Sequence, residues 1–308
     1  MAESWPRFEV ERDWPTIAFL HLASQMPGKM RVAYAPWVNH GWHVALHLVG
    51  EGLTTAPIAC SDGRTFSLLV DLCAHGLALH VSDGTRDLVP FRDGMSIAEL
   101  HHDVITMLDR QRLPSRFNGT PSEIPDAIPF AEDREARAYR RDSAETFHAM
   151  LSRVVPLFEL FRAGFTGKSS PVHLFWGSFD LAVTRFSGRS APPHPGGVPG
   201  LPDRIACEAY SQEVSSAGFW PGNAAMAVEP VFYSYAYPEP AGFRAAKVAP
   251  GGAKFDEGLG EFTLAYEAVR RAGDPGAELT RFLQSTYDAA ANLADWERQR
   301  LEREPVAP

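Results

Sequence analysis

The sequence has 308 residues, of which 45% are hydrophobic and 22% charged, a composition typical of a folded globular chain. Its formal net charge of −9 at pH 7 disfavours a face that binds nucleic-acid phosphates, so we expect no nucleic-acid partner. The opening residues lack a signal-peptide pattern, and no run of about 18 apolar residues predicts a membrane span. The three cysteines lack CxxC spacing, which favours reduced thiols and a cytoplasmic location.

The first predicted element is a helix that begins at Asp13, which caps well before Pro15, and ends near Pro27. β-like runs follow, separated by turns of glycine, aspartate and serine. They cover residues 31–49, 53–60, 65–72, 77–81 and 86–91. Ser96 and Glu99 have the spacing of a capping box, which predicts the start of an amphipathic helix.

The segment 114–141 is rich in proline and charge, and we interpret it as a connection. The word Asp-Ser-Ala-Glu that begins at Asp142 is a second capping-box pattern, and it predicts a helix that Pro156 should kink or restart. Strands are predicted at residues 172–186, 208–215, 230–237 and 260–265. Asp274 followed by Pro275 predicts the start of a long final helix.

Short sequence motifs, called words below, recur in the same order in the two parts of the chain. A tryptophan follows a Gly-Lys pair at nine residues from the glycine, at Trp37 and again at Trp176. Ala-Glu-Leu opens both closing helices, at Ala98 and Ala277, and each helix ends in Arg-Gln-Arg-Leu. The sequence therefore predicts an α+β fold of two pseudo-repeated halves, each with a helix, antiparallel or mixed strands and a helix, packed as one compact unit. The alternative is that the two parts are alike only in composition.

The predicted boundaries follow from these words. They are 1–113 for the first half, 114–141 for the connecting segment and 142–308 for the second half. Since each half would leave an apolar sheet face that the other covers, we do not expect the halves to be independent domains.

Five of the eleven histidines fall between positions 40 and 80. In the predicted strand 31–49, His43 and His47 share one face, and His80 on a later strand could join them. Three converging imidazoles are a ligand set for a divalent metal, so these three histidines are the candidate metal ligands. The alternatives are hydrogen-bonded histidines on a half-buried polar face, and a histidine that serves as a general acid or base.

Charged residues interrupt the apolar strands of the second half. Asp180 and Arg185 lie in the run 172–186, and each should pair or face a ligand because burying an unpaired charge is costly. Alternation puts them on opposite faces, and the Arg185 guanidinium has the fork that holds a carboxylate or phosphate. The candidate catalytic residues are His43, His47, His173, Asp180 and Glu213, and the candidate ligand-binding residues are Trp176, Arg185, Tyr210 and Trp220.

Several familiar motifs are absent from the sequence. It has no GxGxxG or Walker A loop, so no nucleotide cofactor is predicted, and a divalent metal is the one cofactor that the residues suggest. It also lacks a GxSxG nucleophile elbow and a nucleophilic-cysteine signature.

Longer words connect the chain to a known family. Pro36-Trp37-Val38-Asn39-His40, Phe175-Trp176-Gly177-Ser178-Phe179-Asp180-Leu181 and Ala217-Gly218-Phe219-Trp220-Pro221-Gly222 resemble a bacterial family catalogued as domain of unknown function 5996. The resemblance spans essentially the whole chain. Because the family has no established activity, the resemblance implies neither a reaction nor a catalytic residue.

Our leading hypothesis is a small-molecule enzyme with a histidine-rich polar pocket between the two halves, either metal-dependent or not. Arg185 would hold an anionic substrate in that pocket. One alternative is a non-catalytic module that binds or senses a small ligand. A second alternative is a protein-interaction module. The sequence does not indicate an oligomeric state.

Overall fold

The computed structural model describes residues 5–197 and 200–303. The α-helices are α1 (Val10–Tyr34), α2 (Ile97–Arg110), α3 (Arg141–Ala163), α4 (Asp203–Ala209), α5 (Tyr266–Arg270), α6 (Pro275–Leu293) and α7 (Arg298–Leu301). Short 3-10 helices are η1 (Asn39–Val44), η2 (Ala224–Met226) and η3 (Phe243–Ala245). Among the described residues, no helix combines the length and the apolar character that crossing a membrane requires.

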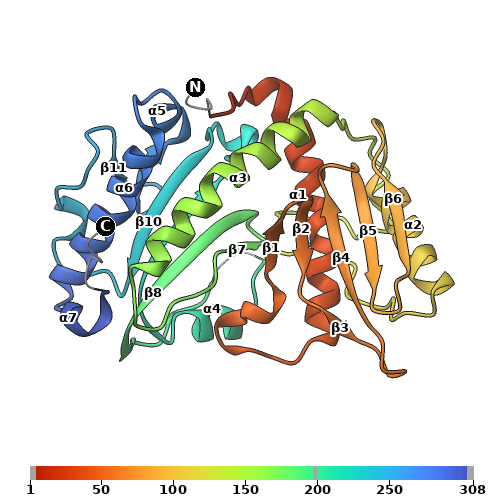
Figure 1. Ribbon diagram of the computed structural model, residues 1–308, viewed down its shortest axis with the longest axis horizontal. Helices are drawn as coiled ribbons and strands as arrows, with labels where there is room; N and C mark the ends of the chain where they lie inside the picture. The colour runs from red at the N-terminus through yellow and green to blue at the C-terminus, as the bar shows by residue number, and fades with distance from the viewer. Residues whose placement is uncertain (1–4, 198–199, 304–308) are drawn as a thin grey trace.

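The strands alternate along the chain with tight turns. They are β1 (Leu46–Val49), β2 (Gly52–Thr55), β3 (Ile58–Ala59), β4 (Thr65–Asp71), β5 (Gly76–Val81), β6 (Arg86–Pro90), β7 (His173–Phe175), β8 (Asp180–Ser190), β9 (Gln212–Trp220), β10 (Val231–Tyr237), β11 (Lys254–Asp256) and β12 (Glu261–Ala265). They form one sheet in the order β11-β12-β10-β9-β8-β7-β1-β2-β4-β5-β6, with β3 paired to β4 (Figure 1). The pairings between these strands are antiparallel.

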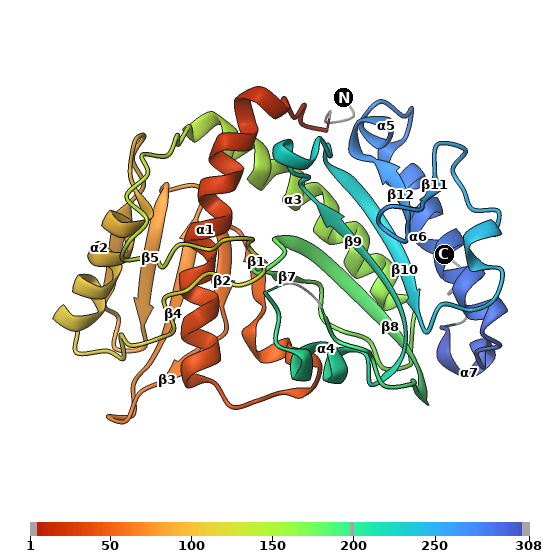
Figure 2. The ribbon, with the colours of Figure 1, turned by 180° about the vertical axis from the view of Figure 1, so that it is seen from behind.

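The two parts of the sheet meet where β1 pairs with β7, through Leu46 and Leu174. Helix α1 packs on β2 and β4, whereas α3 and α6 pack on β8, β9 and β10. Figure 1 shows α3 crossing in front of the β8–β10 part, and Figure 2 shows α1 in front of β2 and β4 with the other face of β8–β10 turned to the viewer. In the described part of the chain, no long helix packs on that second face of β8–β10.

One hydrophobic core joins the two parts of the chain. It includes Leu68 of β4, Leu181 of β8 and Phe232 of β10, all at most 1% exposed, together with side chains of α1 and α3. Helices α1 and α3 also contact each other directly. The fold is therefore α+β, with a large antiparallel sheet and helices that share a single core.

Several predicted helix starts and strands are confirmed. The backbone N–H of Glu99 donates to Ser96 Oγ at 3.2 Å, and Glu99 Oε2 accepts from the Ser96 N–H at 2.8 Å, which is the predicted capping box of α2. Asp274 caps α6 by accepting from the Ala277 N–H at 3.0 Å. The strands β4, β5, β6, β10 and β12 lie where the sequence predicted them.

The predicted strand 31–49 is wrong over most of its length. Helix α1 continues through Pro27 to Tyr34, and residues 39–44 form η1, where His40 and Gly41 have φ values of 59° and 71°. A Cβ on Gly28 would lie 2.1 Å from the Trp176 ring, so the ring packs directly on the helix backbone there. We attribute the longer helix to this tertiary packing, which offsets the cost of an internal proline.

Other boundaries also differ from the prediction. Helix α1 begins at Val10 and not at Asp13, and the predicted strand 53–60 is divided into β2 and β3. The run 172–186 is not one strand, because residues 176–179 form the turn of a β7–β8 hairpin. The run 208–215 is also not one strand, since α4 occupies residues up to Ala209 and β9 begins at Gln212. Helix α3 is confirmed and runs without a break through Pro156, but the predicted capping box at Asp142 is wrong because the helix begins at Arg141 with no side-chain cap.

Candidate functional site

Carboxyl and tyrosine side chains gather on the face of the sheet that faces away from α3 and α6. Strand alternation places Asp180 of β8, Tyr233 and Tyr235 of β10 and Glu261 of β12 on this face, since Ala182, Gly218, Tyr233 and Thr263 form one cross-strand row. Glu123 from the segment before α3 and Tyr210 after α4 join them electrostatically. We call Glu123, Asp180, Tyr210, Tyr233, Tyr235 and Glu261 the carboxyl–tyrosine cluster.

Asp180 lies at the centre of the cluster and is 9% exposed. Its carboxylate accepts hydrogen bonds from the hydroxyls of Ser178 and Tyr233. Burial raises the pKa of Asp180, and the two hydrogen bonds oppose that shift. Burial and the nearby Asp180 raise the pKa of Tyr233 well above its ordinary value, so Tyr233 stays protonated and acts as the donor.

The tyrosines form a continuous row. The hydroxyls of Tyr210 and Tyr235 are 3.0 Å apart, and the rings of Tyr233 and Tyr235 are stacked with centroids 6.1 Å apart. His194 stacks on Tyr210 from the outside, at 4.7 Å between centroids. Burial raises the pKa of both Tyr210 and Tyr235, so the hydroxyl groups of the row stay neutral.

Two glutamates of the cluster have pKa values close to the physiological range. Burial and the charge of Asp180 raise the pKa of Glu123 to about 7 and that of Glu261 to about 8. Glu123 Oε1 lies against Gly177, where an added Cβ would be 2.0 Å away. A carboxyl group with a pKa near 7 can both give and take a proton at neutral pH, which suits general acid–base chemistry.

Three side chains of α1, spaced by four residues, form hydrogen bonds with Ser122 and Gly177, which lie next to Glu123. The Gln25 side chain donates to the Ser122 carbonyl at 2.9 Å and accepts from the Ser122 N–H at 2.7 Å. Lys29 Nζ donates to Ser122 Oγ at 2.7 Å, and His21 Nε2 is 2.8 Å from the Gly177 carbonyl oxygen. His21, Gln25 and Lys29 therefore position both the backbone of the Glu123 segment and the Gly177 turn that its carboxyl group contacts.

Some predicted residues lie at or beside the cluster. Asp180 and Tyr210 belong to it. Trp176 lies in the β7–β8 turn, 5% exposed, with its indole N–H donating to the Val44 carbonyl at 2.9 Å. Trp220 ends β9 opposite Val231, on the face that carries Gly218.

Arg185 lies on the opposite face, as strand alternation predicts. Its guanidinium carbon is 3.5 Å from the ring centroid of Phe161, 4.3 Å from that of Tyr287 and 5.1 Å from that of Phe165. It donates to the Phe161 carbonyl, and burial lowers its pKa to about 10. Enclosed by rings of α3 and α6, Arg185 does not reach a ligand at the cluster.

Glu213 also lies apart from the cluster. Its carboxylate accepts from Arg189 Nη2 at 2.7 Å and from Nε at 2.9 Å, and Arg189 in turn binds the carbonyls of Ala294 and Asp295. This ion pair ties β8 and β9 to the end of α6.

The predicted histidines do not converge. His43 lies in η1, where Nδ1 accepts from the Val38 N–H at 3.2 Å, and His47 lies on β1. His80 is on β5, three strands from β1, which corresponds to roughly 14 Å. Within residues 5–197 and 200–303, no group of three or more His, Cys, Asp or Glu side chains is placed to hold a metal ion.

His173 neighbours His47 across the β1–β7 junction, because the adjacent Leu46 and Leu174 are paired. It is 1% exposed, its Nδ1 lies 2.6 Å from the Pro171 carbonyl oxygen, and its buried Nε2 has no hydrogen-bond partner. Burial lowers its pKa to about 4, so the ring is neutral in the folded protein.

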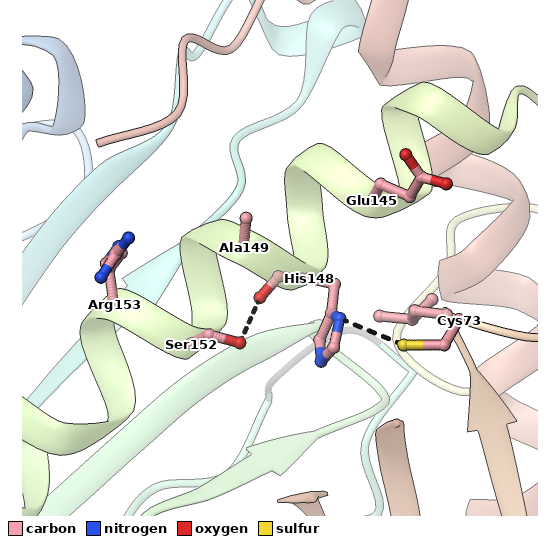
Figure 3. Close-up of a pocket in the computed structure, with 7 residues that line it drawn as sticks. Cys73, Glu145, His148, Ala149, Ser152 and Arg153 are labelled. Carbon is pink, nitrogen blue, oxygen red and sulfur yellow. Dashed lines mark hydrogen bonds between the residues drawn. The ribbon is translucent and has the colours of Figure 1, made fainter. Parts of the chain in front are cut away.

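A surface pocket of about 570 Å³ lies elsewhere, beside α3 (Figure 3). Its lining consists of Leu72, Cys73, Glu145, His148, Ala149, Ser152 and Arg153. In Figure 3 the His148 ring points toward Cys73, with 3.8 Å between Nδ1 and Sγ. Burial and nearby carboxylates raise the pKa of Cys73, so its thiol is not the activated thiolate that cysteine chemistry requires. Cys60, Cys73 and Cys207 are all free.

Sequence reasoning missed four members of the cluster and the lysine beside it. The alternation of Tyr233, Tyr235 and Tyr237 along a predicted strand was a signal for a tyrosine face. The helical spacing of His21, Gln25 and Lys29 was a second signal. The missed residues are Lys29, Glu123, Tyr233, Tyr235 and Glu261. Glu123 had no signal of its own, because its place depends on tertiary contacts of an irregular segment.

The fold and the cluster define an α+β protein with one antiparallel sheet and a polar, carboxyl-rich candidate site on the face of its second part that α3 and α6 do not cover. Residues 5–303 match the model of a family of unknown function, DUF5996, and the chain belongs to this family. The resemblance noted in the sequence is thereby confirmed. No curated protein and no solved structure matches the chain.

Proposed function

We propose that the protein is an enzyme that binds a small polar molecule at the carboxyl–tyrosine cluster and moves protons to and from it. The observation that carries the proposal is the approach of Glu123 and Asp180, which are far apart in the sequence, on a face lined by tyrosine hydroxyls. Neighbouring buried carboxyl groups with raised pKa values are typical of acid–base sites.

Each group has a distinct part in this proposal. Glu123, with its pKa near 7, carries the proton. Asp180 orients the Tyr233 hydroxyl, and the row of hydroxyls binds polar groups of the ligand. The proposal favours a neutral or cationic molecule over the anionic one that Arg185 had suggested, because Arg185 lies on the opposite face and any ionised carboxyl group of the cluster repels an anion.

A ligand screen by thermal shift tests the proposal. A panel of small polyols, amines, aldehydes and ketones is tested with the wild-type protein and with the Glu123→Gln and Tyr233→Phe variants. We expect a ligand that raises the Tm of the wild type and has a much smaller effect on both variants. Glu213→Gln is the control, because Glu213 lies outside the cluster in an ion pair with Arg189.

Two other outcomes discriminate among the hypotheses. A ligand that binds at the cluster and is released chemically unchanged would make the protein a binding or sensing module. If every stabilising ligand acts equally on the wild type and both variants, the site lies elsewhere and the proposal is wrong.

We also propose that the chain consists of two related halves, residues 1–113 and 142–308. The recurring words support this, and each half contributes a long helix, a run of antiparallel strands and a closing helix. Because residues of both halves form one core, neither half should fold alone. Expressing each half separately and measuring circular dichroism and thermal unfolding tests whether a half folds alone. A cooperative unfolding transition in either half would contradict the expectation that neither does.

A further inference from the structure

The chain is poor in lysine, since only four of its 29 lysine and arginine residues are lysines. Lys247 and Lys254 are exposed and Lys168 is half-buried, whereas Lys29 is only 8% exposed. Lysine is among the residues least often buried, because its ammonium loses hydration. The burial of Lys29 beside the carboxyl–tyrosine cluster therefore needs a physical reason.

A purely structural role explains this lysine poorly. Its hydrogen bond goes to one neutral hydroxyl, Ser122 Oγ at 2.7 Å, and Nζ lies 5.6 Å from the ring centroid of Trp176. An arginine would offer more donors to the same segment and would stay charged at any pH. Burial lowers the pKa of Lys29, and the charge of Glu123 opposes that shift to a smaller extent. A lysine that loses its proton readily is a nucleophile, which an arginine is not.

We propose that Lys29 is the nucleophile of this site and forms an imine with the carbonyl carbon of a small aldehyde or ketone. The inference rests on the proposed function, because it requires the substrate to bind at the carboxyl–tyrosine cluster. Two groups that imine formation needs are present there: the amine of Lys29, bound to Ser122, and the carboxyl group of the adjacent Glu123, which exchanges protons near neutral pH.

The step balances without any further reactant. The neutral amine of Lys29 attacks the carbonyl carbon, so a C–N bond forms, the C=O π bond breaks, and Glu123 passes one proton from nitrogen to oxygen to give a carbinolamine. Glu123 then passes the second proton from nitrogen to the hydroxyl group, and the C–O bond breaks to release water while the C=N bond forms. The products are a lysine imine and one water molecule, and addition of water regenerates the amine.

Reductive trapping tests the proposal directly. The full chain is incubated with glycolaldehyde or hydroxyacetone in the presence of cyanoborohydride, which reduces an imine to a stable secondary amine. Intact mass gives the number of adducts, and peptide mapping assigns them among the four lysines and the N-terminal amine. We expect one adduct per chain, at Lys29, with a rate that saturates as the concentration of one probe rises.

Matched variants separate this lysine from the others. Lys29→Arg and Lys29→Met should lose the saturable adduct, and thermal unfolding checks that at least one of them folds. Lys168→Arg should keep it, because Lys168 Nζ is held at the other end of β8 by His40 Nε2 at 2.5 Å and Gln212 Oε1 at 3.1 Å. Glu123→Gln should slow trapping at Lys29 by at least tenfold at pH 7 and flatten its pH dependence.

Other patterns of labelling overturn the proposal. Adducts that grow linearly with probe concentration at the exposed Lys247 and Lys254, with none at Lys29, would show ordinary surface chemistry. A saturable adduct at Lys168 would move the nucleophile to the other lysine. If trapping at Lys29 fails with every probe while Tyr233→Phe still abolishes ligand binding in the thermal-shift screen, the nucleophile is refuted and the proposed function stands.

Discussion

The hydroxyl of Tyr233 on β10 donates to the carboxylate of Asp180 on β8, across the whole width of the intervening strand β9. The phenol ring spans this distance because it lies directly over Gly218, where an added Cβ would be 2.2 Å from the hydroxyl oxygen. The absence of a side chain at Gly218 therefore determines which carboxylate Tyr233 can reach.

Substitution of Gly218 tests this relationship. Gly218→Ala should force the Tyr233 ring away from Asp180 and lower the free energy of unfolding by about 1–3 kcal/mol, through overpacking and a buried hydrogen bond lost. Urea unfolding measures the change. Gly251→Ala is the control, since no atom lies within 4 Å of a Cβ at Gly251. Equal effects of the two substitutions would contradict the role of Gly218.

Ionisation of Glu261 should lower the stability of the protein as the pH rises from 6.5 to 8. Glu261 has a pKa of about 8 in the folded protein and an ordinary value when unfolded, so the folded state holds its proton longer and loses stability as the pH rises toward 8. Glu261→Gln should remove on the order of 1–2 kcal/mol of this pH dependence. Urea unfolding at several pH values measures it.

The exposed Glu257, which pairs with Arg244, provides the control for that measurement. Glu257→Gln should leave the slope between pH 6.5 and 9 unchanged. A wild-type protein equally stable across this range would refute the raised pKa of Glu261.

Five strands (β4, β5, β6, β10 and β12) and two helix starts could be predicted because their signals are local. The capping box of Ser96 and Glu99 and the cap at Asp274 depend on residues within one helical turn. The same reasoning failed at Pro27, because the contact of Gly28 with Trp176 joins residues far apart in the sequence. Local signals are reliable where no distant side chain competes with them.

In the candidate site, too, only the residues with a local sequence signal were predicted. Asp180 was found because a charge inside an apolar strand is conspicuous in the sequence. The histidines of residues 40–47 were assigned to a strand face that does not exist, since His40 and Gly41 adopt positive φ values. Glu123 and Lys29 come together only through Ser122, and no spacing in the sequence indicates that contact.

Acid should destabilise the protein through His173. Its pKa is about 4 when folded and ordinary when unfolded, so the unfolded chain takes up a proton first and stability falls as the pH drops from 6.5 toward 4. His173→Leu should reduce the loss between pH 7 and pH 5 by on the order of 1–2 kcal/mol, as thermal or urea unfolding would show. The exposed His102 is the control. If His102→Leu reduced the loss of stability between pH 7 and pH 5 as much as His173→Leu, the prediction would be wrong.

Arg185 should stabilise the fold without contributing to the site. Arg185→Ala removes a guanidinium packed between the rings of Phe161 and Tyr287, and we expect a loss of about 2–4 kcal/mol in urea unfolding. Arg185→Lys should also destabilise, because an ammonium does not stack as a planar guanidinium does. Trapping at Lys29 should be unchanged in whichever variant folds, and a loss of trapping there would argue against the separation of the two faces.

The sheet is open, so β6 and β11 leave backbone groups that another chain could pair with. Both strands are poor templates for such growth. β11 has three residues and carries Lys254 and Asp256, while β6 carries Arg86 and Asp87, the latter paired with Arg110 of α2. Charge at both borders disfavours strand addition, so the open sheet resists aggregation at its margins.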